Sequence, residues 1–379
     1  METPFEYGRL AVSNNFTNRK KELKHLTDNF SVLANTILIS PRRWGKSSLV
    51  EKAAGLAAKK NKNLRFCMVD AFNVRTEQQF YQQLATAVLN ASSSRLEIVA
   101  ETAKNFMGKF IPRVSFSPDN LQEVSLSLDW KEVIKQPDDI LNMAEKIAAK
   151  NNLKFIICID EFQNVASFDH QLAFQKKLRA NWQKHQHVGY CLYGSKRHML
   201  MDVFTNSSMP FYKFGDLMFL EKIKKEDWIR FITRRFTDTK KTISKENAAY
   251  LTHLADCHPY YVQQLAQLSW LRTQMECCED IINDAHEGLI DQLSLLFQSK
   301  TEELTIIQIN FLSALLEGVN QFSSKETLEE YNLGTSGNVV KLKKTLVNKE
   351  IIDIRNNEFF LLDPIYKSWL KTRYFKLKK

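Results

Sequence analysis

The sequence predicts an α/β protein in which a parallel sheet is covered by helices on both faces. Through residue 221, short apolar runs rich in β-branched residues alternate with segments of helical periodicity. This alternation is typical of parallel strands joined by crossover helices. From residue 222 onward, helical patterns continue without strands until two short strand-like runs near the C-terminus. The chain is therefore expected to combine a sheet domain with a helical C-terminal half.

Each element of the sheet domain follows from its own pattern. Residues 36–39 (TILI) and 155–159 (FIICI) are continuous apolar runs, as expected for buried strands. Helical spacing places Leu23, Leu26 and Phe30 on one face of the first helix. The other expected strands are 64–72 and 188–193, and the other expected helices are 46–60, 77–89, 138–150 and 170–184.

Two hairpins are expected as well. Residues 113–117 and 124–128 alternate apolar and polar residues around a Pro-Asp-Asn turn signal, which predicts a β-hairpin inserted at about residues 111–130. Residues 301–379 show three helical patterns followed by strand-like runs at 351–354 and 359–362, the order found in a winged helix. The expected domains are an α/β core at 1–221, an all-α domain at 222–298 and a winged-helix domain at 299–379.

Composition narrows the class of protein. No apolar run reaches the roughly 18–20 residues that span a bilayer, and the N-terminal METPFEYGRL lacks the pattern of a secretory signal. None of the six cysteines form a C-x-x-C pair, which argues against a structural zinc site. We therefore expect a cytoplasmic protein that makes no membrane contact. Its net charge of +10 permits contact with DNA, but an ordinary solvated basic surface explains the charge equally well.

The strongest motif lies between the first expected strand and the second expected helix. SPRRWGKSS at residues 40–48 matches the phosphate-binding loop G-x-x-x-x-G-K-[ST], with Ser40 in place of the first glycine. Backbone N–H groups of such a loop surround phosphates, Lys46 would reach the β- and γ-phosphates of ATP, and Ser47 would ligate Mg²⁺. Serine tolerates positive φ poorly, so the entry of the loop is expected to differ from that of a glycine loop.

A second motif completes the expected ATP site. The apolar strand at 155–159 ends directly in Asp160 and Glu161. Asp160 would hold Mg²⁺ through water, and Glu161 would polarise the water that attacks the γ-phosphate. Two motifs in the correct order and structural context make a chance match improbable.

These residues resemble the archaeal-type ATPase family, a branch of the AAA+-like and STAND-like P-loop ATPases. The matching segments cover nearly the whole chain: FTNRKKEL (16–23), SPRRWGKSS (40–48), IDEFQ (159–163), Gly194-Ser195 and HPYY (258–261). The resemblance implies a helical lid at 222–297 and a segment 16–19 close to the adenine. It also implies a sensor role for Ser195 and a place for Pro259 near the base or ribose. An ordinary strand-end serine and a helix-breaking proline are the competing interpretations.

The resemblance leaves the arginine finger open, since Lys213 and Arg197 are both candidate substitutes. Slow or partner-dependent hydrolysis is therefore expected. The full predicted site has Lys46, Glu161 and Ser195 for catalysis and Ser47 and Asp160 for the metal. The ATP-binding residues are Phe16, Asn18, Arg19, Pro41, Arg42, Arg43, Trp44, Gly45, Lys46, Ser47, Ser48 and Pro259.

The C-terminal region carries a candidate DNA-contacting helix. Val339, Leu342 and Leu346 share one helical face, while Lys341 and Lys344 point the other way, as in a recognition helix. The same face would also suit a protein partner or self-association. Two functions stay open: an ATP-hydrolysing molecular switch associated with DNA, and a regulatory scaffold that exchanges ADP and ATP with little hydrolysis and contacts protein partners.

Overall fold

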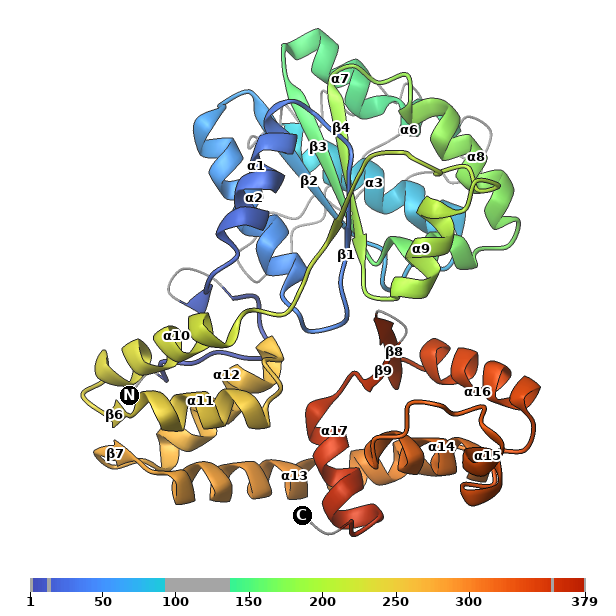
Figure 1. Cartoon of the computed structure of the whole chain (residues 1–379). Helices are drawn as coiled ribbons and strands as arrows, with labels where there is room; N and C mark the ends of the chain where they lie inside the picture. The colour runs from blue at the N-terminus through green and yellow to red at the C-terminus, as the bar shows by residue number, and fades with distance from the viewer. Residues whose placement is uncertain (1–2, 12–14, 93–136, 356–357, 378–379) are drawn as a thin grey trace. The chain divides into compact units, whose positions relative to one another are not determined.

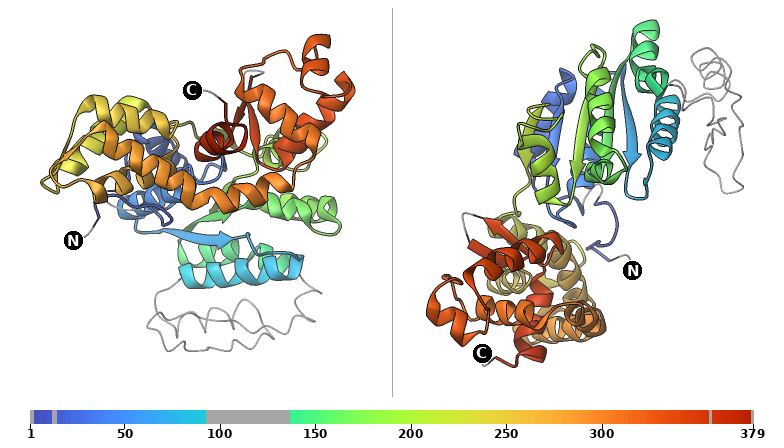
Figure 2. Two further views of the ribbon diagram at one scale, coloured as in Figure 1. Left: turned by 90° about the horizontal axis from the view of Figure 1, so that it is seen from below. Right: turned by 90° about the vertical axis from the view of Figure 1, so that its right-hand side faces the viewer.

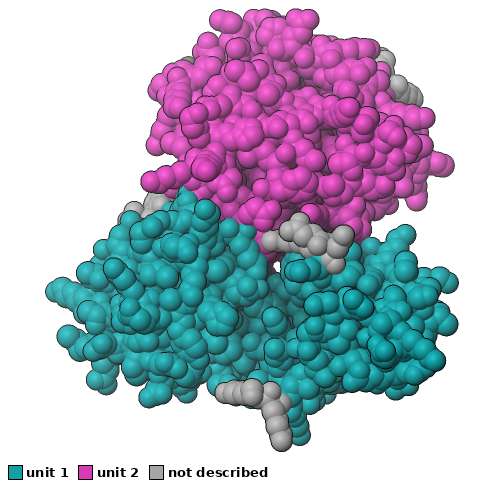
Figure 3. Space-filling view, in the orientation of Figure 1, with its two compact units in different colours: residues 1–18, 222–379 teal, residues 19–221 magenta. Residues whose placement is uncertain are grey.

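The computed structural model describes residues 3–11, 15–92, 137–355 and 358–377 of the 379-residue chain (Figure 1). The chain forms two compact units, which Figure 3 colours separately. Unit 1 comprises residues 1–18 and 222–379, and unit 2 comprises residues 19–221. The predicted hairpin at about 111–130 lies outside the described residues.

Unit 2 is built on a five-stranded parallel sheet of order β2-β3-β4-β1-β5. Ile39 at the end of β1 is in register with Gly194 on one side and Phe219 on the other. Because parallel strands end at the same edge, the segments that follow β1, β3 and β4 come together there. The strands are β1 (Thr36–Ile39), β2 (Leu64–Asp70), β3 (Lys154–Asp160), β4 (Val188–Gly194) and β5 (Asp216–Phe219).

Helices cover both faces of this sheet (Figures 1 and 2). On one face α1 packs against α2, and the Phe30 and Phe66 rings lie 5.3 Å apart. On the other face Phe155, Ile157 and Ile159 of β3 join a core that also contains side chains of α3 and α8. The helical elements are α1 (Lys20–Ser31), α2 (Lys46–Lys60), α3 (Glu77–Ser92), α6 (Pro137–Leu141), α7 (Met143–Asn151), the 3-10 helix η2 (Phe162–Ser167), α8 (Gln171–Trp182) and α9 (Arg197–Thr205).

The structure confirms the strand at 36–39 and extends those expected at 155–159 and 188–193 by one or two residues. It differs from the prediction at 64–72, because β2 ends at Asp70, whose Oδ1 accepts a hydrogen bond from the Phe72 N–H at 2.8 Å. The helix expected at 138–150 is interrupted at Asn142, whose Nδ2 donates to the Asp138 carbonyl and to Asn181 Oδ1, each at 2.7 Å. The sequence patterns did not predict α9 and β5.

Unit 1 is largely helical, and its core runs from α10 to the C-terminal helices. Two short strands, β6 (Thr242–Ile243) and β7 (Glu276–Cys277), pair in parallel where helices alone were expected. The Phe297 ring of α13 lies 5.2 Å from that of Tyr366. The helices are α10 (Lys225–Thr237), α11 (Lys245–Leu254), α12 (Pro259–Arg272), α13 (Glu279–Glu302), α14 (Ile306–Leu316), α15 (Lys325–Glu330), α16 (Ser336–Asn348) and α17 (Pro364–Trp369), and a π-helical turn η3 (Leu370–Tyr374) follows.

The C-terminal part of unit 1 has the predicted order of helices followed by a small antiparallel hairpin. β8 (Ile352–Arg355) pairs with β9 (Glu358–Leu361), and the helix α17 then follows, which was not expected. Within the described ranges, none of the helices combines the length and hydrophobicity needed for a bilayer crossing.

The N-terminal segment belongs to unit 1, although it precedes the sheet in sequence. Phe5 is buried against Phe231 and Phe236 of α10, with ring centroids 6.0 and 5.7 Å apart. Arg235 Nη2 donates to Asn15 Oδ1 at 2.9 Å. The chain therefore starts on the helical unit before it enters unit 2 at Arg19.

Candidate functional site

The loop after β1 leads directly into α2 and turns at a glycine. Gly45 adopts a φ of 88° immediately before Lys46, the first residue of α2. Only glycine adopts this conformation without strain, which explains the glycine of the G-K-S triplet. Ser40, in contrast, is not among the described residues with positive φ, and its Oγ donates to the Pro41 carbonyl at 2.9 Å. The backbone at the loop entry therefore has no need of glycine at position 40.

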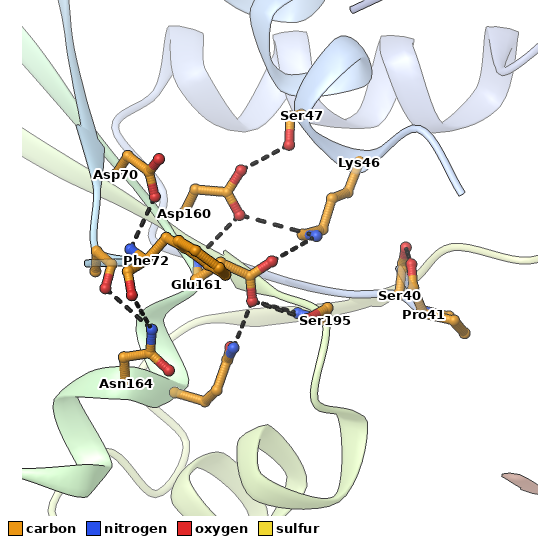
Figure 4. Close-up of polar contacts among 12 residues, drawn as sticks. Ser40, Pro41, Lys46, Ser47, Asp70, Phe72, Asp160, Glu161, Asn164 and Ser195 are labelled. Atoms are coloured by element: carbon orange, nitrogen blue, oxygen red, sulfur yellow. Dashed lines mark hydrogen bonds and ion pairs between the residues drawn. The ribbon is translucent and has the colours of Figure 1, made fainter. Parts of the chain in front are cut away.

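The two motifs meet at the edge of the sheet (Figure 4). Lys46 Nζ lies 3.1 Å from Glu161 Oε1 and 3.9 Å from Asp160 Oδ1. Ser47 Oγ donates to Asp160 Oδ2 at 2.6 Å. Four side chains from segments more than 110 residues apart in sequence thus form one polar cluster.

Glu161 is held more firmly than its neighbour. The Ser195 N–H and Oγ donate to its Oε2 at 3.2 and 2.8 Å, and Gln163 Nε2 donates to the same oxygen. Its backbone lies in the left-handed region, with φ 52° and ψ 40°. A non-glycine residue in that region costs conformational energy, and such residues are concentrated at functional sites.

The pKa values of Asp160 and Glu161 are shifted in opposite directions. Burial raises the pKa of Asp160 above its ordinary value, and the nearby Lys46 offsets only part of that effect. Burial also disfavours the charged form of Glu161, but Lys46 and the hydrogen bonds from Gln163 and Ser195 outweigh it. Its pKa therefore lies below the ordinary value. Glu161 is held as a carboxylate that accepts several hydrogen bonds.

The donor set suits a magnesium ion. Ser47 Oγ and Asp160 Oδ2 are adjacent hard oxygen donors, and Mg²⁺ prefers one or two such protein ligands together with water and phosphate oxygens. The 15-residue helix α2 begins at Lys46, so its N-terminal N–H groups add donors for an anion at the same place.

The loop after β2 is tied to this cluster by a residue that the motifs did not single out. Asn164 Nδ2 donates to the Ala71 and Phe72 carbonyls at 3.0 and 3.1 Å (Figure 4). Asn164 lies on η2, three residues after Glu161. No sequence signal marked it, because both of its partners are backbone atoms about 92 residues away.

Arg19 is buried beneath the phosphate-binding loop and is only 5% exposed. Its guanidinium donates to the Glu221 carbonyl and to the Trp44 carbonyl, the latter at 3.4 Å, and pairs with Glu22 at 3.3 Å. Burial lowers the pKa of this guanidinium. Trp44 itself is buried, whereas Arg42 and Arg43 are exposed. These contacts make Arg19 an anchor of the loop.

Three predicted ATP-binding residues belong to unit 1. Asn18 donates to Asp227 in the first turn of α10. Pro259 is the first residue of α12, a position that favours proline because its fixed φ suits a helix start. Phe16 is half-buried. Their predicted contacts with the nucleotide stay predictions.

The candidate arginine-finger substitutes both contact aromatic rings. The Arg197 guanidinium lies 5.6 Å from the ring centroid of Phe219, and Lys213 Nζ lies 5.2 Å from that of Tyr212. Arg197 begins α9, two residues after Ser195. Neither geometry identifies a finger.

The sheet order, the loop after β1 and the acidic pair after β3 define the AAA+ fold, and solved structures match it over nearly the whole chain. The Walker-type ATPase of Pyrococcus abyssi matches with a TM-score of 0.65 and 18% identity, covering 97% of this chain and 100% of its own. The ORC2 protein of Aeropyrum pernix, in ADPNP and ADP complexes, matches with a TM-score of 0.59 and 15% identity, covering 95% and 94%. The Aeropyrum pernix ORC1 protein in complex with DNA matches with a TM-score of 0.51 and 12% identity, covering 99% of each chain.

Neither a protein-family model nor a curated protein sequence matches the chain. At these identities the likeness establishes the fold alone. The roles of individual residues therefore rest on the geometry of the site.

Proposed function

We propose that this protein binds ATP with Mg²⁺ and hydrolyses it, acting as a nucleotide-dependent molecular switch. The observation that carries the proposal is the cluster at the sheet edge. Lys46 Nζ is 3.1 Å from Glu161, and Ser47 Oγ is 2.6 Å from Asp160. The resemblance in fold to an ORC2 protein solved with ADPNP and ADP supports the choice of nucleotide.

Each residue has a distinct task in this proposal. The N–H groups at the start of α2 bind the phosphates, and Lys46 exchanges its carboxylate partner for the β- and γ-phosphate oxygens. Ser47 and Asp160 hold the metal, which when bound neutralises charge on the β- and γ-phosphates. Glu161 accepts a proton from the attacking water. Ser195 holds Glu161 and faces the same edge of the sheet.

The proposal is tested by steady-state ATP hydrolysis of the full chain and of Lys46→Ala. Lys59→Ala is the matched control, since Lys59 is an exposed lysine at the far end of the same helix. Turnover by the parent and Lys59→Ala, together with its loss in Lys46→Ala, supports the proposal. Tight ATP binding without turnover by the parent would favour the regulatory scaffold. Absence of both binding and turnover contradicts the proposal.

We also propose that the C-terminal region, residues 299–379, is a winged-helix domain that contacts DNA, with residues 222–298 as a helical lid. Val339, Leu342 and Leu346 of α16 are buried, while Lys341 and Lys344 are exposed on the same helix. β8 and β9 follow as a hairpin in the position of a wing. The likeness in fold to an ORC1 protein solved with DNA supports this choice of partner.

A further inference from the structure

We infer that Gln163 is a positioning residue that, with Ser195, anchors one oxygen of the Glu161 carboxylate and leaves the other oxygen to act on water. Oε2 of Glu161 is the anchored oxygen, and Oε1 is the working oxygen. The inference rests on the proposed ATPase function and adds a residue and a division of labour to it.

The contacts of Glu161 divide between its two oxygens. Oε2 accepts from the Ser195 N–H at 3.2 Å, from Ser195 Oγ at 2.8 Å and from Gln163 Nε2. Oε1 accepts from Lys46 Nζ at 3.1 Å. The donors to Oε2 belong to Ser195 and Gln163, which the proposed function does not assign to phosphate. The donor to Oε1 is Lys46, which a bound phosphate would attract. ATP binding would therefore release Oε1 and leave Oε2 in place.

Burial of the Gln163 amide lowers the stability of the fold unless the amide makes a favourable contact. The residue is 1% exposed, and its Oε1 is buried with no hydrogen-bond partner among the described residues. An unpaired buried carbonyl lowers stability. Turning the amide over would put this oxygen against the Glu161 carboxylate, so the donor stays on Glu161. The contact with Glu161 explains why an amide occupies this position.

Gly194 makes room for this arrangement. A Cβ added at Gly194 would lie 1.9 Å from Gln163 Oε1, far closer than two non-bonded atoms approach each other. Gly194 ends β4 directly before Ser195. The Gly-Ser pair therefore has two functions: the glycine admits the Gln163 amide, and the serine supplies two donors to the same carboxylate oxygen.

The anchor matters for the chemistry because a general base must be held in line with its proton. As the water oxygen bonds to the γ-phosphorus, the bond between that phosphorus and the β–γ bridging oxygen breaks, and ADP leaves with the electron pair. The water proton passes to Oε1 of Glu161. A carboxylate fixed through Oε2 presents Oε1 in one orientation, whereas a free carboxylate rotates away.

Gln163→Met tests the inference, because methionine is similar in length and shape but has no donor. We expect kcat for ATP hydrolysis to fall about 10- to 100-fold, with KM and the ATP dissociation constant changed by less than about twofold. Gln175→Met is the matched control. Gln175 is also 1% exposed in unit 2, and neither of its amide atoms has a hydrogen-bond partner among the described residues. Its kcat should stay within about twofold of the parent.

Two further variants, Gly194→Ala and Ser195→Ala, test the contact between Gln163 and Glu161 through neighbouring residues. Gly194→Ala should displace the flexible end of Gln163 and lower kcat in the same way. Added to Gln163→Met, it should cause little further loss, because the contact it disturbs is already gone. Ser195→Ala and Gln163→Met should combine less than additively, because both act through Oε2. A crystal structure of Gln163→Met should show the Glu161 carboxylate turned away from Ser195.

The outcomes separate this inference from the proposed function. If Gln163→Met lowers kcat no more than Gln175→Met does, Gln163 is only a core residue and the inference is wrong. A matched loss of kcat and ATP affinity would indicate general damage to the site and would also overturn it. If the parent has no ATPase activity, the proposed function fails. The crystal structure of Gln163→Met then tests the anchoring separately, and an unmoved Glu161 carboxylate would show that Gln163 does not hold it.

Discussion

Lys46 Nζ lies 3.1 Å from Glu161 Oε1, so the lysine expected to bind phosphate is paired with the acid expected to activate water. In the proposed function, a bound phosphate would compete with this carboxylate for the same cation. Binding of the phosphate would then free the carboxylate, so that Glu161 could act on water only when the site is occupied.

Lys46→Ala is expected to weaken ATP binding and to destabilise unit 2. A charge-assisted contact with phosphate is worth about 1.5–3 kcal/mol, or roughly 10- to 150-fold in dissociation constant. The variant also leaves Asp160 and Glu161 together without their cation, so the midpoint of thermal unfolding should fall. Calorimetric titration with ATP and a thermal melt measure the two effects. Unchanged ATP affinity would remove Lys46 from the phosphate site.

Glu161→Gln is expected to separate binding from chemistry. The amide keeps the size of the side chain but cannot accept a proton, so turnover should fall by about 10²–10⁴-fold. ATP should bind at least as tightly as in the parent, since Lys46 loses its carboxylate partner. Single-turnover hydrolysis and equilibrium binding provide the two measurements. Glu77→Gln, in the same unit but on α3, is the control for the charge change.

Arg19→Lys distinguishes a loop anchor from a contact with adenine. Lysine keeps the charge, but its single nitrogen does not reproduce the two separate nitrogens that Arg19 presents to the Glu221 and Trp44 carbonyls, so the free energy of unfolding should fall by about 1–3 kcal/mol. As an anchor, Arg19 would affect ATP and GTP binding by the same factor, because it acts through the loop backbone. A loss confined to ATP would instead place the side chain at the base. Arg75→Lys, at an exposed position, is the control.

Much of the fold could be predicted because its signals are local. The apolar runs of β1, β3 and β4 need no partner to be recognised as buried strands, and the G-K-S triplet and Asp160-Glu161 have fixed spacing to strand ends. β5 escaped prediction because its apolar run, residues 217–220, is only four residues long and the strand is only partly buried. Such a short run does not distinguish an edge strand from another apolar segment.

The contacts that organise the site could not be predicted, because their partners are distant or are backbone atoms. Arg19 binds a carbonyl 202 residues away, and Gln163 has no signal in its own sequence that identifies Glu161 as its partner. The expected place of segment 16–19 close to the adenine stays a prediction, and no sequence pattern marked that the two units divide between Asn18 and Arg19. Only the folded chain shows which side of that division each residue joins.

Lys341→Glu with Lys344→Glu tests whether α16 contacts DNA. Both lysines are exposed, while Lys343 packs on the Phe359 ring at 4.3 Å and is left unchanged. If the pair faces phosphates, the double variant should bind every duplex more weakly. The slope of log K against log salt should also fall by about one for each phosphate that a lysine no longer neutralises. Fluorescence anisotropy at several salt concentrations measures both quantities.

Lys225→Glu with Lys245→Glu is the matched control, because it makes the same change in net charge at exposed positions on α10 and α11. A general electrostatic attraction would weaken equally in both double variants, whereas a DNA-contacting α16 is affected by the first alone. The basic tail after Tyr366 would add its own non-specific contribution to DNA binding. A variant that lacks this tail separates that contribution from the contribution of α16. If the parent fails to bind duplex DNA even at about 50 mM salt, DNA is not the partner, since electrostatic association is strongest there. A change in assembly state or nucleotide exchange in the α16 variant would then identify this face as a contact with protein.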